Sequence, residues 1–124
     1  MRLFVIQEHN ADKAGLHWDI RFEDYDKHNL RSFVIPKHRL PNNKERLLVV
    51  PVSDHKWEYK DFEGEIKEGY GKGTVKLVHN DYVKVPSYTD KEIIFEFEGE
   101  TYRIYKASWM QNYLIQRHEN TKSN

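Results

Sequence analysis

The stretch Leu16-His17-Trp18-Asp19-Ile20-Arg21-Phe22-Glu23 decides the fold class of this chain. Apolar and polar side chains alternate along it, which is typical of a β-strand with one face toward a core. His17, Asp19 and Arg21 share one face, because residues two apart in a strand point the same way. The predicted core face consists of Leu16, Trp18, Ile20 and Phe22.

Further strands are predicted on both sides of this stretch, where runs of apolar and aromatic residues are separated by turn residues. They cover residues 3–7, 31–35, 46–52, 74–78, 82–85, 92–98, 101–105 and 112–117. Hairpin turns are predicted at residues 79–81 and at Gly99-Glu100, and Pro51 indicates a strand edge or end. Residues 54–74 hold four of the six glycines and are predicted to form a long irregular loop. This pattern favours a small closed or nearly closed antiparallel β-barrel with long irregular loops and little helix.

The length of 124 residues predicts one domain over residues 1–118, with a polar, disordered tail over residues 119–124. Twenty basic and twenty acidic residues give a net charge of zero, which excludes a strongly basic nucleic-acid binder but not a local basic patch. The absence of cysteine excludes disulfides and thiolate metal sites. No apolar run is long enough for a membrane span or a signal peptide, so we expect a cytoplasmic protein.

Two imidazoles and one carboxylate form the first candidate site. His9 ends the first predicted strand, and the short connection to the next strand can bring it beside His17 and Asp19. This donor set suits a divalent transition metal with open positions for water or substrate. Taken singly, each residue is explained as well by a solvated strand face or a surface histidine.

His55 and Tyr59 form the second candidate site. Their spacing of four residues aligns them on one helical turn, where both side chains can donate hydrogen bonds to a phosphate oxygen. A protonated His55 can also assist a leaving oxygen, which would make activity fall at high pH. A turn in which Asp54 caps the backbone is an equally good explanation of this segment.

The third candidate site is a basic set near the end of the strand over residues 31–35. It could track a phosphate backbone, although a solvated loop explains it nearly as well. Its members are Lys37, His38, Arg39 and Arg46. The loop Glu68–Gly73 lacks the ending of a phosphate-binding loop, and we interpret it as a turn that needs positive φ or close backbone approach.

Together these segments resemble the 3'-phosphoesterase domain family attached to bacterial ligase D. The blocks that carry the resemblance follow one another in the family's order along nearly the whole chain. They are Val5-Ile6-Gln7-Glu8-His9, Leu16-His17-Trp18-Asp19-Ile20-Arg21, Ser32-Phe33-Val34-Ile35-Pro36-Lys37, Asp54-His55 through Tyr59 to Phe62-Glu63-Gly64, Glu68-Gly69-Tyr70-Gly71-Lys72-Gly73 and Tyr113-Leu114-Ile115. The sequence departs from the family pattern in a longer His9–His17 interval, in Ser53 before Asp54-His55, and in lacking the segment that often precedes the first block.

The resemblance implies an antiparallel β-barrel and a manganese-dependent enzyme, another divalent transition metal being an alternative. Such enzymes heal nucleic-acid 3' ends by removing a 3'-terminal ribonucleoside, a 3'-phosphate, or both, in DNA repair. By position, His9, His17 and Asp19 would bind the metal. The residues that would hold the scissile phosphate are Arg21, His55 and Tyr59. The supporting substrate contacts would be Gln7, Lys37 and Arg46, and we expect Arg39 to line the same groove. The expected partners are 3' ends of DNA, with or without a terminal ribonucleotide, and a separate DNA ligase or polymerase.

Two other functions remain open. His17 and Asp19, with a distant His79 or His118, superficially fit the facial triad of a non-haem Fe(II) oxygenase. A non-catalytic β-barrel that binds nucleic acid is the third candidate. Manganese-dependent activity on a labelled 3' end would separate the three.

Overall fold

The computed structural model describes residues 1–118, and the predicted tail at 119–124 lies outside them. Its strands form one antiparallel sheet in the order β5-β6-β1-β2-β3-β4-β10-β9-β8-β7. The elements are β1 (Arg2–Ala11), β2 (Gly15–Asp24), β3 (Asn29–Ile35), β4 (Arg46–Lys56), the 3-10 helix η1 (Trp57–Asp61), β5 (Gly64–Ile66), β6 (Gly73–Val83), β7 (Ser87–Tyr88), β8 (Glu92–Phe97), β9 (Glu100–Tyr105) and β10 (Tyr113–Arg117). Within residues 1–118, no helix has the length and apolar character needed to cross a membrane.

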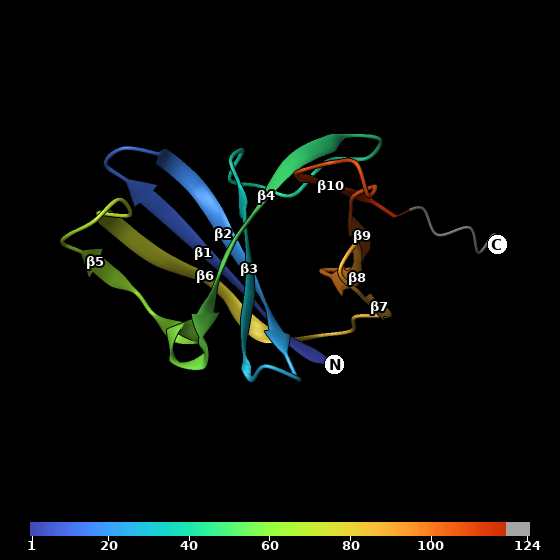
Figure 1. Cartoon of the computed structure of the whole chain (residues 1–124), viewed down its shortest axis with the longest axis horizontal. Coiled ribbons are helices and arrows are strands. Elements are labelled where there is room, and N and C mark those ends of the chain that lie inside the picture. The colour runs from blue at the N-terminus through green and yellow to red at the C-terminus, as the bar shows by residue number, and fades with distance from the viewer. Residues whose placement is uncertain (119–124) are drawn as a thin grey trace.

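Strand β4 carries the chain from one half of the sheet to the other (Figure 1). Its first part, Arg46–Val49, pairs with β10, and its second part pairs with β3. Pro51 pairs with Phe33 of β3 but lies beyond the last residue of β4 that pairs with β10. The β10 side of β4 is therefore an open sheet edge at Pro51, where the missing N–H of proline removes no hydrogen bond. This confirms the strand edge predicted at Pro51. Glu96 N–H donates to the Lys84 carbonyl across 2.9 Å, which brings β8 to the chain directly after β6. The sheet therefore curls into the predicted, nearly closed barrel.

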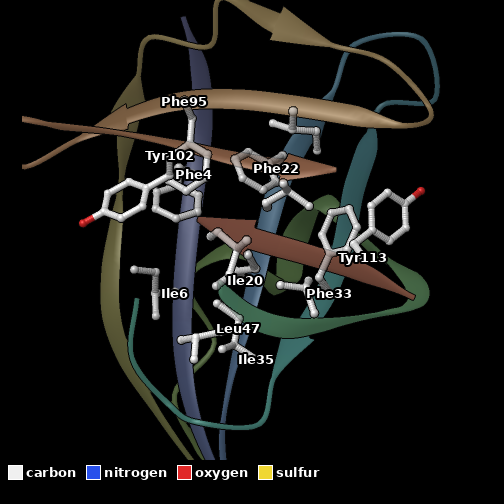
Figure 2. Close-up of a cluster of buried hydrophobic side chains, with 14 of the residues drawn as sticks. Phe4, Ile6, Ile20, Phe22, Phe33, Ile35, Leu47, Phe95, Tyr102 and Tyr113 are labelled. Carbon is white, nitrogen blue, oxygen red and sulfur yellow. The ribbon is translucent and has the colours of Figure 1, made fainter. Parts of the chain in front are cut away.

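Aromatic and branched side chains from both halves of the sheet fill the interior (Figure 2). Phe4, Phe22 and Phe95 pack with ring centroids 4.8 to 5.2 Å apart at the centre. On β2, Ile20 and Phe22 are fully buried there, and Trp18 packs against the same cluster. The prediction was wrong for Leu16, which is 40% exposed because the strand has passed the end of the core.

Two local predictions need correction. Residues 79–81 form no turn, because β6 runs unbroken from Gly73 to Val83. The long strand β1 pairs with β6 from Gly73 to Val83, and Val78 of β6 is the extra residue of a bulge opposite Ile6 and Gln7. This long pairing outweighs the local turn propensity. The predicted irregular loop at 54–74 also holds the end of β4, η1 and β5.

The second predicted hairpin is confirmed, with its turn one residue earlier. Phe97 pairs with Glu100, which leaves Glu98 and Gly99 as the two turn residues. Their φ angles of 50° and 81° are those of the type I′ turn that suits the twist of a hairpin.

Candidate active site

The β1–β2 hairpin places the predicted metal ligands side by side. His9 pairs with His17, and Gln7 pairs with Asp19, so these side chains project from one face of the sheet. His9, His17 and Asp19 are each less than 10% exposed, and Arg21 is 2% exposed. A solvated strand face is therefore excluded as the explanation of these polar residues.

The donor atoms of His9, His17 and Asp19 all lie within 4.8 Å of one another. The two Asp19 carboxylate oxygens face different imidazoles: Oδ2 lies 3.3 Å from His9 Nδ1, and Oδ1 lies 3.2 Å from His17 Nε2. The structure thus groups His17 and Asp19 with His9, whereas His79 packs against the rings of Phe4 and Phe97.

The second nitrogen of each imidazole contacts a backbone carbonyl. His9 Nε2 lies 2.7 Å from the Gly71 oxygen, and His17 Nδ1 lies 3.1 Å from the Gly15 oxygen. A carbonyl oxygen only accepts, so these nitrogens carry protons, which leaves the opposite nitrogens facing Asp19. A protonated nitrogen there donates to the carboxylate, whereas a neutral ring presents its lone pair. Two such nitrogens and a carboxylate that face one another fit a shared cation, and imidazoles fixed through their other nitrogen are typical of metal ligands.

The pKa shifts of His17 and Asp19 agree with a site that binds a cation. The hydrogen bond to Asp19 raises the pKa of His17 above its usual value, against the opposing effect of burial. Burial pushes the pKa of Asp19 upward, but the His17 hydrogen bond and the Arg21 charge outweigh burial and leave that pKa lowered. The metal-free site therefore retains a carboxylate and attracts positive charge.

Arg21 lies next to this group on β2. Its Nε–H donates to Gln7 Oε1 across 2.7 Å, and its Nη2 lies 3.5 Å from Asp19 Oδ2. Its Nη1 lies 3.2 Å from His55 Nδ1, and the guanidinium stands 4.9 Å from the centre of the Tyr59 ring. The planar cation is therefore held on several sides, beside the metal ligands.

The end of β4 and the helix η1 bring His55 and Tyr59 to the same place. Their ring centroids are 4.6 Å apart, as the spacing of four residues predicted. Burial lowers the pKa of His55, as does the charge of Arg21, and burial raises the pKa of Tyr59. His55 is therefore neutral near pH 7 in the free protein, which runs against the predicted protonated form. Asp54 does not cap this turn with its side chain, which contacts Lys27 and Asn29 instead.

One cavity of about 460 Å³ contains the metal ligands, Arg21, His55 and Tyr59. Much of its wall is apolar and comes from Ala11, Ala14, Leu16, Val34, Pro36, Val52, Ile66 and Tyr70. Sequence reasoning missed Tyr70 and the carbonyl of Gly71, although the glycine-rich spacing of their loop marked a tight turn.

The predicted substrate-contact residues lie around this cavity rather than in it. Gln7 is fully buried, and its amide is engaged by Arg21 and by the carbonyls of Tyr59 and Phe62. Lys37 follows the wall residue Pro36 directly. Among the described residues, the lining of the cavity includes none of the predicted basic set Lys37, His38, Arg39 and Arg46. Arg39 forms a two-pronged ion pair with Glu45, and Arg46 contacts Gln116 on β10.

Comparison with known proteins agrees with this arrangement. The chain matches the model of the DNA Ligase D 3'-phosphoesterase domain over residues 7–110. The multifunctional non-homologous end joining protein LigD of Pseudomonas aeruginosa is 40% identical over 73 residues, which are 58% of this chain and 8% of that protein. LigD of Mycobacterium bovis is 41% identical over 73 residues, 58% of this chain and 9% of that protein. The match thus spans less than a tenth of the length of these relatives. Because the family match covers most of the chain, the protein belongs to the DNA Ligase D 3'-phosphoesterase domain family.

Proposed function

We propose that this protein is a metal-dependent phosphoesterase that processes the 3' ends of nucleic acid in DNA repair. Its reactions in this proposal are removal of a 3'-terminal ribonucleoside, of a 3'-phosphate, or of both. The observation that carries the proposal is the buried Arg21 guanidinium beside the group of His9, His17 and Asp19 in one cavity. Family membership and the similarity to LigD proteins support the DNA-repair role.

His9, His17 and Asp19 would hold a divalent cation, which we propose to be manganese. Such a cation would supply charge neutralisation at the phosphate and a lowered pKa of bound water. The chain contributes the correct tautomers, because the carbonyls of Gly71 and Gly15 hold the protons on the far side of both imidazoles.

Arg21 would bind the non-bridging phosphate oxygens, where negative charge grows as the phosphorus is attacked. Its fork of donors suits this role, because it can grip two oxygens at once and keeps its charge. Gln7 accepts from Nε, Asp19 lies beside Nη2 and His55 lies beside Nη1, so the remaining N–H groups of Nη1 and Nη2 would bind the phosphate. The rigid arrangement means that little reorganisation is needed when the charge develops.

His55 and Tyr59 would donate to the same phosphate from the other side of the cavity. His55 Nδ1 lies 3.2 Å from both Arg21 Nη1 and the Ser53 carbonyl oxygen, so it can accept from the first or donate to the second. In the tautomer that accepts from Arg21, Nε2 carries the ring proton and can donate it to a phosphate oxygen. The phenol of Tyr59 keeps its proton, because burial raises its pKa. Both groups therefore serve as neutral donors in this proposal.

The basic residues outside the cavity would act at longer range. Lys37, Arg39 and Arg46 can attract the phosphate backbone of a strand whose end enters the site, with an effect that salt weakens. Because Glu45 already neutralises Arg39, we expect Lys37 to contribute more. A separate DNA ligase or polymerase would use the healed 3' end.

The decisive test is release of a 3'-terminal ribonucleoside or phosphate from a labelled primer-template, with manganese and with a chelator. We expect manganese-dependent release that Arg21→Ala reduces on the order of 10² or more. Arg21→Lys should restore little of the activity, because an ammonium cannot reproduce the fork. Arg103→Ala, which removes an ion pair on β8 and β9, is the matched control and should keep full activity.

Three outcomes would contradict the proposal. Undiminished activity of folded Arg21→Ala would remove the phosphate-binding role of Arg21. Binding of 3' ends without any release would favour the non-catalytic module. Turnover of 2-oxoglutarate with iron would favour the oxygenase.

A further inference from the structure

Tyr70 is an exposed aromatic residue that the metal and phosphate sites do not explain. Its side chain is 75% exposed, yet it lines the same cavity as His9, His17 and Arg21. Single exposed rings are common on protein surfaces, but a ring that is mostly exposed and also lines a cavity stands at the mouth of that cavity, where it can contact a ligand.

The backbone fixes Tyr70 in this position. Lys72 N–H donates to the Gly69 carbonyl across 3.1 Å, which closes a four-residue turn with Tyr70 and Gly71 at its corners. The Gly71 carbonyl contacts His9, and Asp12 N–H donates to the Lys72 carbonyl across 2.8 Å. The turn is therefore attached both to a metal ligand and to the end of β1, and the ring projects from a rigid support.

Apolar residues line the cavity at the end of the sheet where Gly73 follows the Tyr70 turn. Gly73 pairs with Ile66 and Ala11, and Ala11 pairs with Gly15, which stands between the lining residues Ala14 and Leu16. Arg21 and His55 supply hydrogen-bond donors to the same cavity. A phosphate gains nothing from the apolar part, since it needs charge and hydrogen bonds. The component of a nucleic-acid end that suits a flat, apolar surface is a base, and bases stack on aromatic side chains irrespective of their identity.

We propose that Tyr70 is a stacking platform for the nucleobase next to the scissile phosphate. This inference rests on the proposed function, because it places the phosphate beside Arg21 and the proposed metal ligands. It extends that function by assigning the site a binding contact that discriminates nucleic acid from other phosphate esters. The side chain contributes to substrate affinity and positioning and takes no part in the chemistry.

The test uses the full chain in a chelator, where binding is measured without turnover. The probes are primer-templates with the fluorescent base 2-aminopurine at the terminal or at the penultimate position of the 3' end. We expect binding to quench the fluorescence at one of these positions in the wild-type protein and in Tyr70→Phe. Tyr70→Ala should bind about tenfold more weakly and lose the quenching. The responding position identifies the base.

A second arm replaces the responding base with an abasic residue. The wild-type protein should bind this end about tenfold more weakly, whereas Tyr70→Ala should bind both ends equally. Tyr82→Ala removes a tyrosine ring that is 50% exposed on β6, does not line the cavity and should behave as the wild type. Equal preference of wild type and Tyr70→Ala for the base-containing end, or no quenching at either position, would overturn the inference.

Failure of the stacking role can be distinguished from failure of the proposed function. If manganese-dependent release is found but Tyr70→Ala retains the preference for a base, the phosphoesterase stands and the platform is wrong. If the preference depends on Tyr70 but no 3' end is processed, the platform stands and the catalytic proposal is wrong.

Discussion

Arg21 donates its Nε–H to Gln7 Oε1 across 2.7 Å, and both side chains are buried to within 2% of their surface. Gln7 in turn donates its amide N–H groups to the carbonyls of Tyr59 and Phe62, at 3.0 and 3.1 Å. One side chain thus connects the guanidinium on β2 to the backbone of η1, which carries Tyr59. Gln7 is therefore placed to align the groups that we propose to bind phosphate, and it does not line the cavity itself.

Gln7→Met should therefore lower turnover without removing the metal site. The variant leaves the buried Arg21 Nε–H and two carbonyls without their partner, and an unsatisfied buried group costs about 1–3 kcal/mol of folding free energy. We expect kcat to fall about tenfold, an alignment effect, with little change in manganese affinity. Urea unfolding, steady-state kinetics and metal titration measure the three quantities.

Gln7→Glu is the informative companion variant. It keeps an acceptor for Arg21 and loses the donor to η1, so it should retain more turnover than Gln7→Met. Equal turnover of Gln7→Met and the wild type would show that Arg21 needs no such alignment.

Manganese should bind at His9, His17 and Asp19, and each single replacement by Ala should abolish that binding. Their donor atoms lie within 4.8 Å of one another, and the remaining two residues supply too few ligands for tight binding. A metal that binds the folded state alone stabilises it, by about 2.7 kcal/mol at a concentration one hundred times its Kd. Thermal unfolding with and without manganese should show this shift in the wild type and lose it in the three variants.

His118→Ala is the matched control, since His118 is an exposed residue beyond β10. It should retain the full metal-dependent shift. A shift that persists in His17→Ala would place the metal elsewhere.

The sequence correctly predicted that His9, His17 and Asp19 lie together, because the geometry of this group is local. In a short hairpin with alternating polarity, His9 lies opposite His17, and Asp19 lies on the same face of the sheet. This arrangement does not depend on contacts with distant parts of the chain. His55 and Tyr59 also contact each other as their four-residue spacing predicted, although His55 lies near the end of β4 and only Tyr59 lies in the 3-10 helix η1.

The features that the sequence did not predict depend on distant contacts. The Gly71 carbonyl that fixes the tautomer of His9 is 62 residues away in the chain, and backbone groups leave no trace in residue types. Asn80 and Asp81 have the composition of a turn but pair with Val5 and Phe4, because β1 offers a complete strand partner. The ion pair of Arg39 with Glu45 also depends on the fold of a loop.

His55 should titrate below pH 6.5, and its pKa should rise toward that value in Arg21→Gln. Burial lowers the pKa first and the Arg21 charge lowers it further, so removing the charge reverses part of the effect. NMR of the imidazole protons measures both values, with His55→Gln used to assign the signals. A wild-type pKa above 6.5, or one that Arg21→Gln leaves unchanged, would contradict the proposed environment.

The lowered pKa of His55 also makes the stability of the protein depend on pH. Below pH 6.5 the unfolded chain takes up a proton that folded His55 resists, so this residue makes the protein less stable as the pH falls. The difference in unfolding free energy between wild type and His55→Gln should therefore shift against the wild type on going from pH 7 to pH 5. That difference isolates His55 from His79, whose pKa burial also lowers.

Gly73→Ala should destabilise the protein and weaken metal binding together. Gly73 starts β6 at a φ of +151°, and a Cβ there would lie 2.1 Å from the Asn10 carbonyl oxygen. The clash adds to backbone strain of about 1–3 kcal/mol, so we expect a loss of at least about 3 kcal/mol in urea unfolding. The turn that carries Tyr70 and the Gly71 carbonyl leads directly into Gly73. Displacement of this turn should therefore also lower the manganese affinity about 10-fold or more, as for other groups that orient metal ligands.

Gly99→Ala is the control variant, because Gly99 has a φ of +81° but open space around its Cβ. It should lower the free energy of unfolding by about 1–2 kcal/mol and leave metal affinity unchanged. Equal losses of stability in the two variants, with unchanged metal affinity in both, would show that β1 and the turn do not depend on their close approach at Gly73.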